Sequence, residues 1–292
     1  MHEPVLTEKV LEYLDPQPNE NFIDCTTGGG GHTFAIATRI APKGKILALD
    51  WDAETIQPFT EEVRKRKLQN RVLAENENFA DIKEVAAKNA FRPVAGILFD
   101  LGLSSDQLES RGRGFTFQKE EPLDMRYNTQ NPITAEKLLN YSSKIQLERM
   151  LKDYGEEQFA KQIAEAIVQS RTQTHLQKTS QLVQIVEQAT PKWYQRKKIH
   201  PATKTFQALR IAVNNELENI KQGLQGATEL ISQNGKIAVI SFHSLEDRIV
   251  KEFFKQNPLL RPITKKPIIP PLAEIKQNSK ARSAKLRVAV KL

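Results

Sequence analysis

The sequence predicts an α/β protein whose mostly parallel sheet is interrupted by an inserted all-helical domain. Short apolar runs alternate with helical patterns from residue 21 to residue 102, and this alternation is typical of parallel sheets. From about residue 109 to residue 200 only helical periodicity is convincing. The alternation then resumes. We therefore expect α/β segments at 1–108 and 201–292, with a helical insertion at 109–200.

Composition narrows the class of protein. The chain has 292 residues, 39% of them hydrophobic, and no apolar run approaches the length of roughly 18 residues that a membrane span needs. A single cysteine excludes an internal disulfide framework, and the scattered histidines lack metal-ligand spacing, so we expect no metal site. The N-terminus shows no signal-peptide pattern. We expect a cytoplasmic protein with no membrane association.

The first elements surround a glycine-rich loop. A helix is expected at Pro4–Tyr13, a buried strand at Asn21–Ile23 and a helix at Thr33–Ile40. Between strand and helix runs the loop Asp24–His32, with consecutive glycines at its centre. Glycine lets the backbone adopt positive φ and approach a ligand closely, and the free N–H groups of the helix start face such a ligand. The loop therefore predicts a nucleotide or nucleoside site.

Two later strands in this half end in carboxylates. Lys45–Asp50 ends about twenty residues beyond the loop, where such folds place the acid that binds a ribose. A helix capped by Asp52 is expected up to about Lys67, then a strand at Arg71–Ala74 and a helix at Asp81–Ala90. Val94–Gly102 is a further strand containing Asp100 near its end. Because parallel strands present their carboxyl ends at one edge, Asp50 and Asp100 should lie near the loop.

The spacing within the loop favours one class of ligand. The dinucleotide fingerprint fails, because Thr33 stands where its third glycine should be, and His32 follows Gly31 where a phosphate-binding P-loop needs lysine. The pattern Asp24-x-Thr26-x-Gly28-x-Gly30 looks like the first motif of S-adenosylmethionine (AdoMet) methyltransferases. Asp50 would then hold the ribose. For Asp100 two roles stay open: it holds a substrate amine, or it helps to hold the cofactor.

Apolar periodicity also predicts the helices and strands of the insertion and of the second α/β part. Helices are expected at Thr134–Leu139, Lys144–Lys152, Gln158–Ser170 and Ser180–Gln188, then one long helix at Thr205–Ser232. Lys236–Ser241 should be a strand, followed by a helix started by Ser244 and Glu246–Asp247, and Ala284–Leu292 a closing strand. Pro258–Pro271 is expected to be mostly loop. At the insertion boundary, Asp124 and Arg126 are spaced for an ion pair.

Positive charge gathers at two places. The net charge is +8, which favours a polyanionic partner. One cluster interleaves cations with aromatic residues: Lys192, Trp193, Arg196, Lys197 and Lys198. The other follows Lys276 and includes Arg282, Lys285 and Arg287, without a carboxylate. Cations with aromatic rings are the composition that holds an RNA backbone and stacks its bases, although a solvated surface or a flexible tail would look similar.

Longer blocks resemble a known family, the bacterial small-subunit ribosomal RNA cytosine-N4 methyltransferases of the MraW type. The resemblance covers nearly the whole chain. Its blocks are His2–Leu6, Asp24–His32, Gly96–Gly102, Arg113–Phe115, Pro122–Arg126, His200–Arg210, Ser241–Arg248 and Arg282–Arg287. Two departures stand at the start of the insertion: Glu120-Glu121 replaces Asp-Gly, and Asp106 replaces a proline. Both put the local loop shape in doubt and leave the chemistry untouched.

The resemblance implies a class I AdoMet-dependent methyltransferase with a Rossmann-like sheet. It would methylate the N4 amine of a cytosine in the decoding region of 16S rRNA, on the small ribosomal subunit. The cofactor would contact Gly30, Gly31, His32, Asp50, Phe79, Asp100 and Gln107. Two other readings compete: a nicotinamide-dependent dehydrogenase, and a non-catalytic RNA-binding or ribosome-assembly protein. The sequence is compatible with a homodimer and does not fix the oligomeric state.

Overall fold

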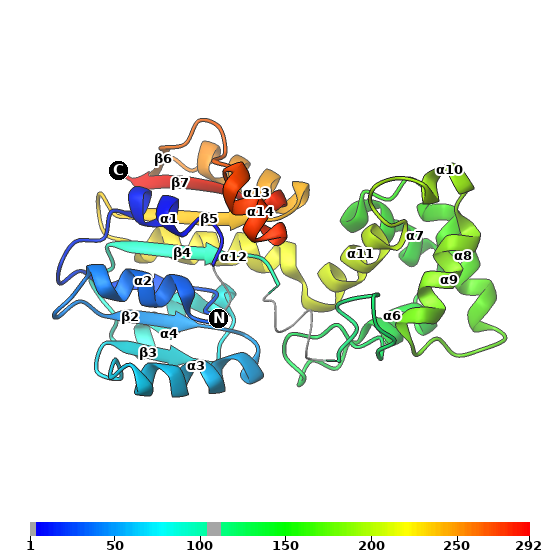
Figure 1. Cartoon of the computed structure of the whole chain (residues 1–292), viewed down its shortest axis with the longest axis horizontal. Coiled ribbons are helices and arrows are strands. Elements are labelled where there is room, and N and C mark those ends of the chain that lie inside the picture. The colour runs from blue at the N-terminus through cyan, green and yellow to red at the C-terminus, as the bar shows by residue number, and fades with distance from the viewer. Residues whose placement is uncertain (1–3, 104–111) are drawn as a thin grey trace. The chain divides into compact units, whose positions relative to one another are not determined.

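The computed structural model describes residues 4–103 and 112–292. The chain forms two compact units (Figure 1). The first, which we call the sheet unit, comprises Met1–Gly102 and Leu217–Leu292. The second, the helical unit, is Leu103–Glu216. The helical unit thus extends beyond the predicted insertion at both ends.

A seven-stranded sheet forms the centre of the sheet unit, in the order β3-β2-β1-β4-β5-β7-β6. The strands are β1 (Phe22–Asp24), β2 (Ile46–Leu49), β3 (Val72–Glu75), β4 (Gly96–Asp100), β5 (Lys236–Ser241), β6 (Leu260–Pro262) and β7 (Lys285–Lys291). The pairings among β1 to β5 are parallel, and β7 runs antiparallel to both β5 and β6. The predicted α/β fold with a mostly parallel sheet is confirmed. Because the chain leaves β1 for β2 on one side and later adds β4 on the other, the strand order reverses between β1 and β4, where such folds bind ligands.

Both faces of the sheet are buried, and neighbouring residues of a strand serve opposite faces. In β1, Phe22 packs into one apolar cluster and Ile23 into the other. Leu98 of β4 joins the cluster of Phe22, whereas Ile97 and Phe99 join that of Ile23. This is the period-two pattern of a strand, and burial on both faces explains why these strands read as continuous apolar runs.

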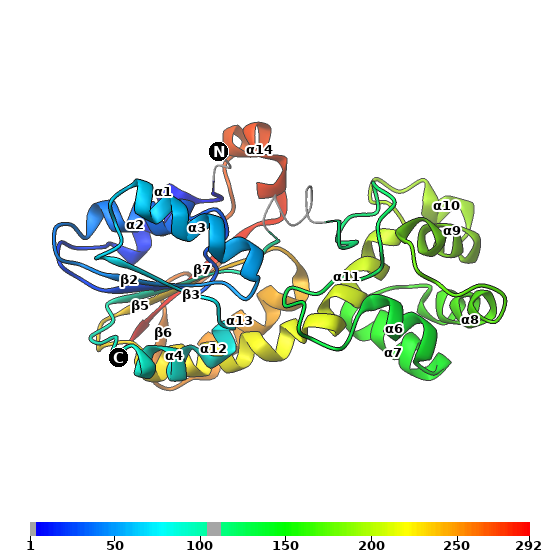
Figure 2. The same ribbon diagram turned by 90° about the horizontal axis from the view of Figure 1, so that it is seen from below.

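Helices cover the two faces, as Figure 2 shows. On one face lie α1 (Thr7–Leu14), α2 (Gly31–Arg39) and α3 (Ala53–Lys65), and on the other lie α4 (Ile82–Lys88), α12 (Glu216–Leu230) and α13 (Ser244–Gln256). Asp52 caps α3 as predicted, accepting a bond from Glu54 N. The cap of α13 is His243 rather than Ser244. A short helix that the sequence analysis missed, α14 (Leu272–Gln277), follows the proline-rich segment.

The helical unit has its own core. Its helices are α6 (Ala135–Tyr141), α7 (Lys144–Gly155), α8 (Ala160–Arg171), α9 (Thr179–Ala189), α10 (Lys192–Gln195) and α11 (Ala202–Asn214). Leu139, Leu151, Ile163, Leu182 and Leu209, one from each of the longer helices, meet in a single buried cluster. The predicted helices from 134 to 188 are therefore confirmed. Across the described parts of both units, no helix has the length and apolar character of a membrane span.

The prediction of one long helix over Thr205–Ser232 is wrong. Helix α11 ends at Asn214 and α12 begins at Glu216, because Asn215 between them has a φ of 51°. This left-handed conformation cannot continue a right-handed helix, and asparagine is one of the few residues that adopt it readily. Periodicity alone does not detect such a break, since the apolar spacing continues on both sides.

Side chains of the helical unit hold the end of α11 in place. The buried Asn214 donates from Nδ2 to Met125 O (2.7 Å) and accepts at Oδ1 from Tyr127 N (2.8 Å). Arg210 forms a two-pronged ion pair with Glu216, at 2.9 and 3.0 Å. Arg210 therefore serves the fold by fixing the start of α12.

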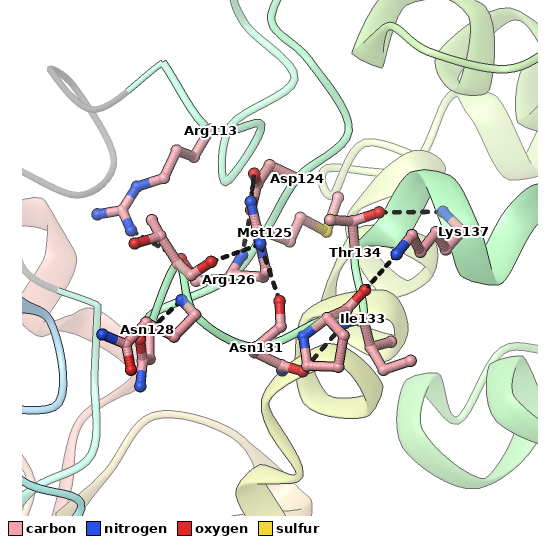
Figure 3. A network of polar contacts seen from close by, with 12 residues as sticks. Arg113, Asp124, Met125, Arg126, Asn128, Asn131, Ile133, Thr134 and Lys137 are labelled. Atoms are coloured by element: carbon pink, nitrogen blue, oxygen red, sulfur yellow. Dashed lines mark hydrogen bonds and ion pairs between the residues drawn. The ribbon is translucent and has the colours of Figure 1, made fainter.

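A polar network organises the loop before α6 (Figure 3). Arg126 Nη2 lies 2.7 Å from Asp124 Oδ2, so the predicted ion pair is confirmed. Arg126 also donates to the backbone carbonyl of Asn131 (2.8 Å), and Arg113 donates to the carbonyl of Arg126 (2.8 Å). These bonds satisfy backbone carbonyls that no regular element pairs.

The two glutamates that depart from the family pattern have partners here. Glu121 is buried and accepts from Gly114 N (2.9 Å). Glu120 pairs with Lys178 (2.6 Å) and accepts from Ser180 Oγ (2.9 Å). The local loop shape is thus fixed by contacts with the start of α9.

Candidate functional site

The glycine loop starts from a buried carboxylate at the end of β1. Asp24 accepts from Thr26 N (3.2 Å) and from Thr33 Oγ1 (2.6 Å), and its side chain is fully buried. Burial raises the pKa of Asp24 to about 6 although both bonds favour the charged form. Asp24 thus ties the two ends of the loop together across the turn.

The glycines of this loop serve different purposes. Gly28 and Gly30 have φ of 49° and 80°, which side chains with a Cβ rarely adopt. A Cβ at Gly30 would also lie 2.5 Å from the ring of Phe34, and one at Gly31 would lie 2.6 Å from Pro4 Cγ. At Gly29 a Cβ would meet nothing within 4 Å. Close packing therefore explains why positions 30 and 31 are glycine, whereas a Cβ at position 29 would lie in open space.

Asp50 closes the second strand and faces the loop. Its Oδ2 accepts from Gly28 N (3.0 Å) and its Oδ1 from Asp52 N (3.0 Å). Burial raises the pKa of Asp50 to about 6, against the effect of these two bonds. Each carboxylate oxygen accepts more than one bond, so Asp50 retains capacity for a ligand hydroxyl. Part of its role is nevertheless to shape the loop.

Asp100 and His32 meet at the end of β4. His32, in the first turn of α2, has its Nε2 3.6 Å from Asp100 Oδ2. Among the described residues, neither ring nitrogen of His32 has a hydrogen-bond partner, and Asp100 Oδ1 is also buried without one. The backbone N–H of Asp100 donates to Thr26 Oγ1 (2.6 Å), which fixes the strand end against the loop. Unsatisfied buried polar atoms are rare in proteins and mark a position where a ligand supplies the missing bonds.

The charges around His32 decide its protonation. Burial disfavours the imidazolium, but the Asp100 carboxylate, with smaller contributions from Asp24 and Glu274, outweighs burial and raises the pKa of His32. The Asp100 carboxylate thus favours the positively charged form of the His32 ring.

Two segments distant in sequence cover this end of the loop, and sequence reasoning missed both contacts. Glu274 of α14 accepts from Leu6 N at 2.7 Å, across 268 residues. Leu6, with a φ of 57°, leads into α1, and Pro4 lies on Gly31. A proline directly before an apolar pair gives no signal of its destination, so only the folded chain reveals this arrangement.

Phe79 and Gln107 are the remaining residues predicted to contact the cofactor. Phe79 begins a short 3-10 helix (Phe79–Asp81), is partly buried, and meets Phe99 edge-to-face with ring centroids 5.6 Å apart. Gly223 of α12 packs on the Phe79 ring. The described contacts of Phe79 are thus those of a core aromatic, and its stacking on adenine stays a prediction. Gln107 lies outside the described residues.

Cys25 is buried behind the loop. Burial raises the pKa of its thiol well above the usual value, and the nearby Asp24 adds to this effect. A nucleophilic cysteine needs the opposite, a thiolate stabilised by cations or a helix N-terminus. Cys25 is therefore an inert core residue.

The predicted RNA-contacting residues fall into three groups. Lys192, Trp193, Arg196, Lys197 and Lys198 are all exposed, on or just after α10 of the helical unit. Arg282 is exposed in the sheet unit and Lys285 is partly exposed. Arg287 is buried, with its Nε 2.6 Å from Asp247 Oδ1. We therefore withdraw Arg287 as an RNA contact: a closing strand placed inside the sheet turns this cation toward α13.

The site was tested against AdoMet on its own geometry. Bonding capacity remains at Asp50, one oxygen of Asp100 lacks a partner, and space is open at Gly29. A nucleoside with ribose hydroxyls and a cationic sulfonium suits carboxylates at these positions. The residues present therefore fit the group.

Comparisons with known proteins give the same answer. The family model of the MraW methylase family matches residues 1–292. The ribosomal RNA small subunit methyltransferase H of Persephonella marina is 44% identical, covering 100% of this chain and 99% of that protein. The proteins of the same name from Thermosipho melanesiensis and Desulfotalea psychrophila are 45% and 43% identical, each covering 100% of this chain and 98% of the relative. The chain belongs to the MraW methylase family. It is an AdoMet-dependent methyltransferase with a class I, Rossmann-like fold.

Proposed function

We propose that this member of the MraW methylase family transfers a methyl group from AdoMet to the exocyclic N4 amine of a cytosine in 16S rRNA. The relatives' names place the methyl group on small-subunit ribosomal RNA. The observation that supports the choice of an amine is Asp100, whose Oδ1 is buried at the end of β4 and has no partner in the described part of the chain. We place the reaction in the cytoplasm, on the small ribosomal subunit, in its decoding region.

Direct transfer of the methyl group requires no covalent intermediate between protein and substrate. AdoMet, when bound, supplies an electrophilic methyl group on a sulfonium. Cytosine N4 is a poor nucleophile because its lone pair is delocalised into the ring. A carboxylate that accepts a hydrogen bond from N4 localises this pair and favours the positive charge that develops as the N–CH3 bond forms and the S–CH3 bond breaks. The thioether of AdoMet is the leaving group, and the extra N4 proton passes to the Asp100 carboxylate and from there to solvent. Holding amine and methyl in line supplies much of the rest.

His32 supports Asp100 in this role. The imidazole Nε2 lies 3.6 Å from Oδ2 of Asp100, so Oδ1, which has no partner among the described residues, is left for the amine. We assign catalysis to Asp100 and cofactor binding to Asp50 with the loop Gly28–His32. The buried, protonated Cys25 argues against methylation of cytosine C5, which needs a cysteine nucleophile to add to the ring.

We propose that the exposed cations bind the RNA backbone. These are Lys192, Arg196, Lys197 and Lys198 of the helical unit, with Arg282 and Lys285 of the sheet unit. Phosphate contacts of this kind position the substrate and carry no sequence information. A non-catalytic RNA-binding protein would show the same cations, but it would not need the orphan oxygen at Asp100.

The test is methyl transfer to a defined substrate. Small subunits from cells that lack this chain are incubated with it and labelled AdoMet, and the labelled nucleoside is identified by chromatography with N4- and C5-methylcytidine standards. We expect label in N4-methylcytidine of 16S rRNA. Label in C5-methylcytidine would overturn the assignment of Asp100. RNA binding without any transfer would favour the ribosome-assembly reading, and nicotinamide binding in place of AdoMet would favour a dehydrogenase.

A further inference from the structure

We propose that Trp193 is a stacking platform for an unpaired base of RNA, with the Lys197 ammonium over one face of its ring. The inference rests on the proposed RNA substrate and adds how the helical unit holds it. Cations alone would only attract the RNA backbone. A platform would select single-stranded RNA, whose bases are free to stack.

The ring of Trp193 is presented to solvent. Its exposed fraction is 54%. The aromatic neighbours Phe159 and Tyr194 meet it at interplanar angles of 62° and 84°, with centroids 5.8 and 5.9 Å away. No described aromatic ring stacks parallel on Trp193. Because these contacts are edge-to-face, a parallel stacking partner is still missing.

The segment that carries Trp193 is held firmly. Tyr194 turns inward, and its hydroxyl lies 3.0 Å from both carboxylate oxygens of the buried Glu157. Burial and the charge of Glu157 raise the pKa of Tyr194, so the hydroxyl stays protonated and donates. Gln195 donates to the carbonyls of Glu187 (2.6 Å) and Thr190 (2.8 Å). Because the two residues that follow Trp193 are anchored, its side chain loses less conformational entropy on binding than one on a mobile segment would.

The charges around the ring suit alternating bases and phosphates. Lys197 Nζ lies 5.0 Å from the Trp193 ring centroid and 4.7 Å from that of Tyr194. Within the described chain, Lys192, Arg196 and Lys198 have no carboxylate within salt-bridge distance, which leaves them available to phosphates. An acidic peptide would use the same cations, but it offers no flat group for the indole. The geometry therefore favours single-stranded RNA over an acidic protein.

Trp193 provides its own spectroscopic readout. The chain contains two tryptophans, so in Trp51→Phe the emission comes from Trp193 alone. Circular dichroism confirms that this full-length variant is folded. The probes are a twelve-nucleotide oligocytidylate, an abasic oligonucleotide of the same length, and polyglutamate. We expect strong quenching by oligocytidylate only. Equal quenching by the abasic strand or by polyglutamate, or quenching by none, would overturn the platform.

Variants in the otherwise native chain give an independent measurement. Anisotropy of labelled oligocytidylate should show that Trp193→Ala weakens binding by about 5- to 150-fold, the range for loss of one stacked base. Trp193→Phe should restore part of this loss. The matched control is Tyr141→Ala, which removes an aromatic ring of the same unit that is 76% exposed and lies outside the cluster. Equal losses in Trp193→Ala and Tyr141→Ala, or none in either, would overturn the inference.

The two proposals fail separately. If the oligonucleotide depends on Trp193 but no methyl group reaches 16S rRNA, the proposed reaction is wrong and the platform stands. If N4-methylation proceeds and Trp193→Ala binds RNA like the native chain, the platform is wrong and the reaction stands.

Discussion

The carboxylates at the glycine loop are largely buried, whereas the cations on and just after α10 are exposed. In the sheet unit, Asp24 and Asp50 are tied to backbone N–H groups of the loop, and their pKa is raised by burial. In the helical unit, Lys192, Arg196 and Lys198 are exposed. The first arrangement fixes atoms within tenths of an ångström, whereas the second produces a field that salt screens within about 8–10 Å.

Because one set of charges is largely buried and the other exposed, different measurements report on the two sites. Changes to the buried carboxylates should alter rate or cofactor affinity and depend little on ionic strength. Changes to the exposed cations should alter RNA affinity and depend strongly on it. The predictions below use this difference, beginning with the largest expected effect.

Asp100→Asn should lower the single-turnover rate by about 10²- to 10³-fold, as loss of one preorganised electrostatic contact does in other enzymes. The shape and an acceptor oxygen remain, but the negative charge is lost. Rapid-quench measurement on small subunits gives the rate, and calorimetry gives AdoMet affinity. A loss of affinity as large as the loss of rate would make Asp100 a cofactor ligand instead.

Asp50→Ala should weaken AdoMet binding by about 10- to 100-fold, corresponding to one charge-assisted bond of about 1.5–3 kcal/mol. Because Asp50 also accepts from Gly28 N and Asp52 N, we expect a lower melting temperature as well. Glu54→Ala, on the neighbouring helix, is the control. Unchanged affinity in a folded Asp50→Ala protein would remove Asp50 from the cofactor site.

AdoMet affinity should fall as the pH drops below about 6. The pKa of Asp50 in the free chain is raised to about 6, and its ionised form is the better acceptor of ribose bonds. Binding therefore favours deprotonation, and affinity falls by up to tenfold per pH unit below this value. Asp50→Asn should flatten the profile in titrations between pH 5 and pH 7.5. An equal slope in both proteins would assign the titration elsewhere.

Neutralising Arg196, Lys197 and Lys198 together to glutamine should reduce the salt dependence of RNA binding. For single strands each lost phosphate contact lowers the log–log slope by about 0.7, or about 2 for three contacts. Arg287→Gln serves as the contrasting variant, since it breaks the pair with Asp247 and should lower stability while leaving the slope unchanged. If the slope of the triple variant is also unchanged, the cluster is only a solvated surface.

Cys25→Ala should have the smallest effect. The side chain is buried and protonated, so its removal costs about 1 kcal/mol of stability and leaves most of the activity. Methyl transfer at a temperature well below the melting point checks this. An inactive variant that still binds AdoMet would show that Cys25 takes part in the chemistry, contrary to N4 methylation.

Sequence reasoning predicted the features that are set by residues close together in the chain. Asp50 and Asp100 were predicted at one edge because each ends an apolar strand, and strand ends in a parallel sheet coincide. It could not find the Glu274–Leu6 contact, which spans 268 residues. It placed Arg287 at the surface, because a cation within a cationic tail gives no sign of the buried carboxylate that it meets. The turn at Asn215 was missed for a related reason: its left-handed φ depends on contacts from Asn214 to a loop almost ninety residues away, at 2.7 and 2.8 Å.

The position of β7 has a consequence for synthesis on the ribosome. This strand, Lys285–Lys291, lies between β5 and β6 and is the last strand of the sheet in sequence order. Until it emerges, the nascent sheet has an unpaired edge at β5, and such edges template aggregation. The helical unit is translated before β7 and has its own core, so its folding does not depend on β7. The sheet can therefore be completed only after β7 has left the ribosome, and nascent chains halted before residue 285 should depend most on chaperones.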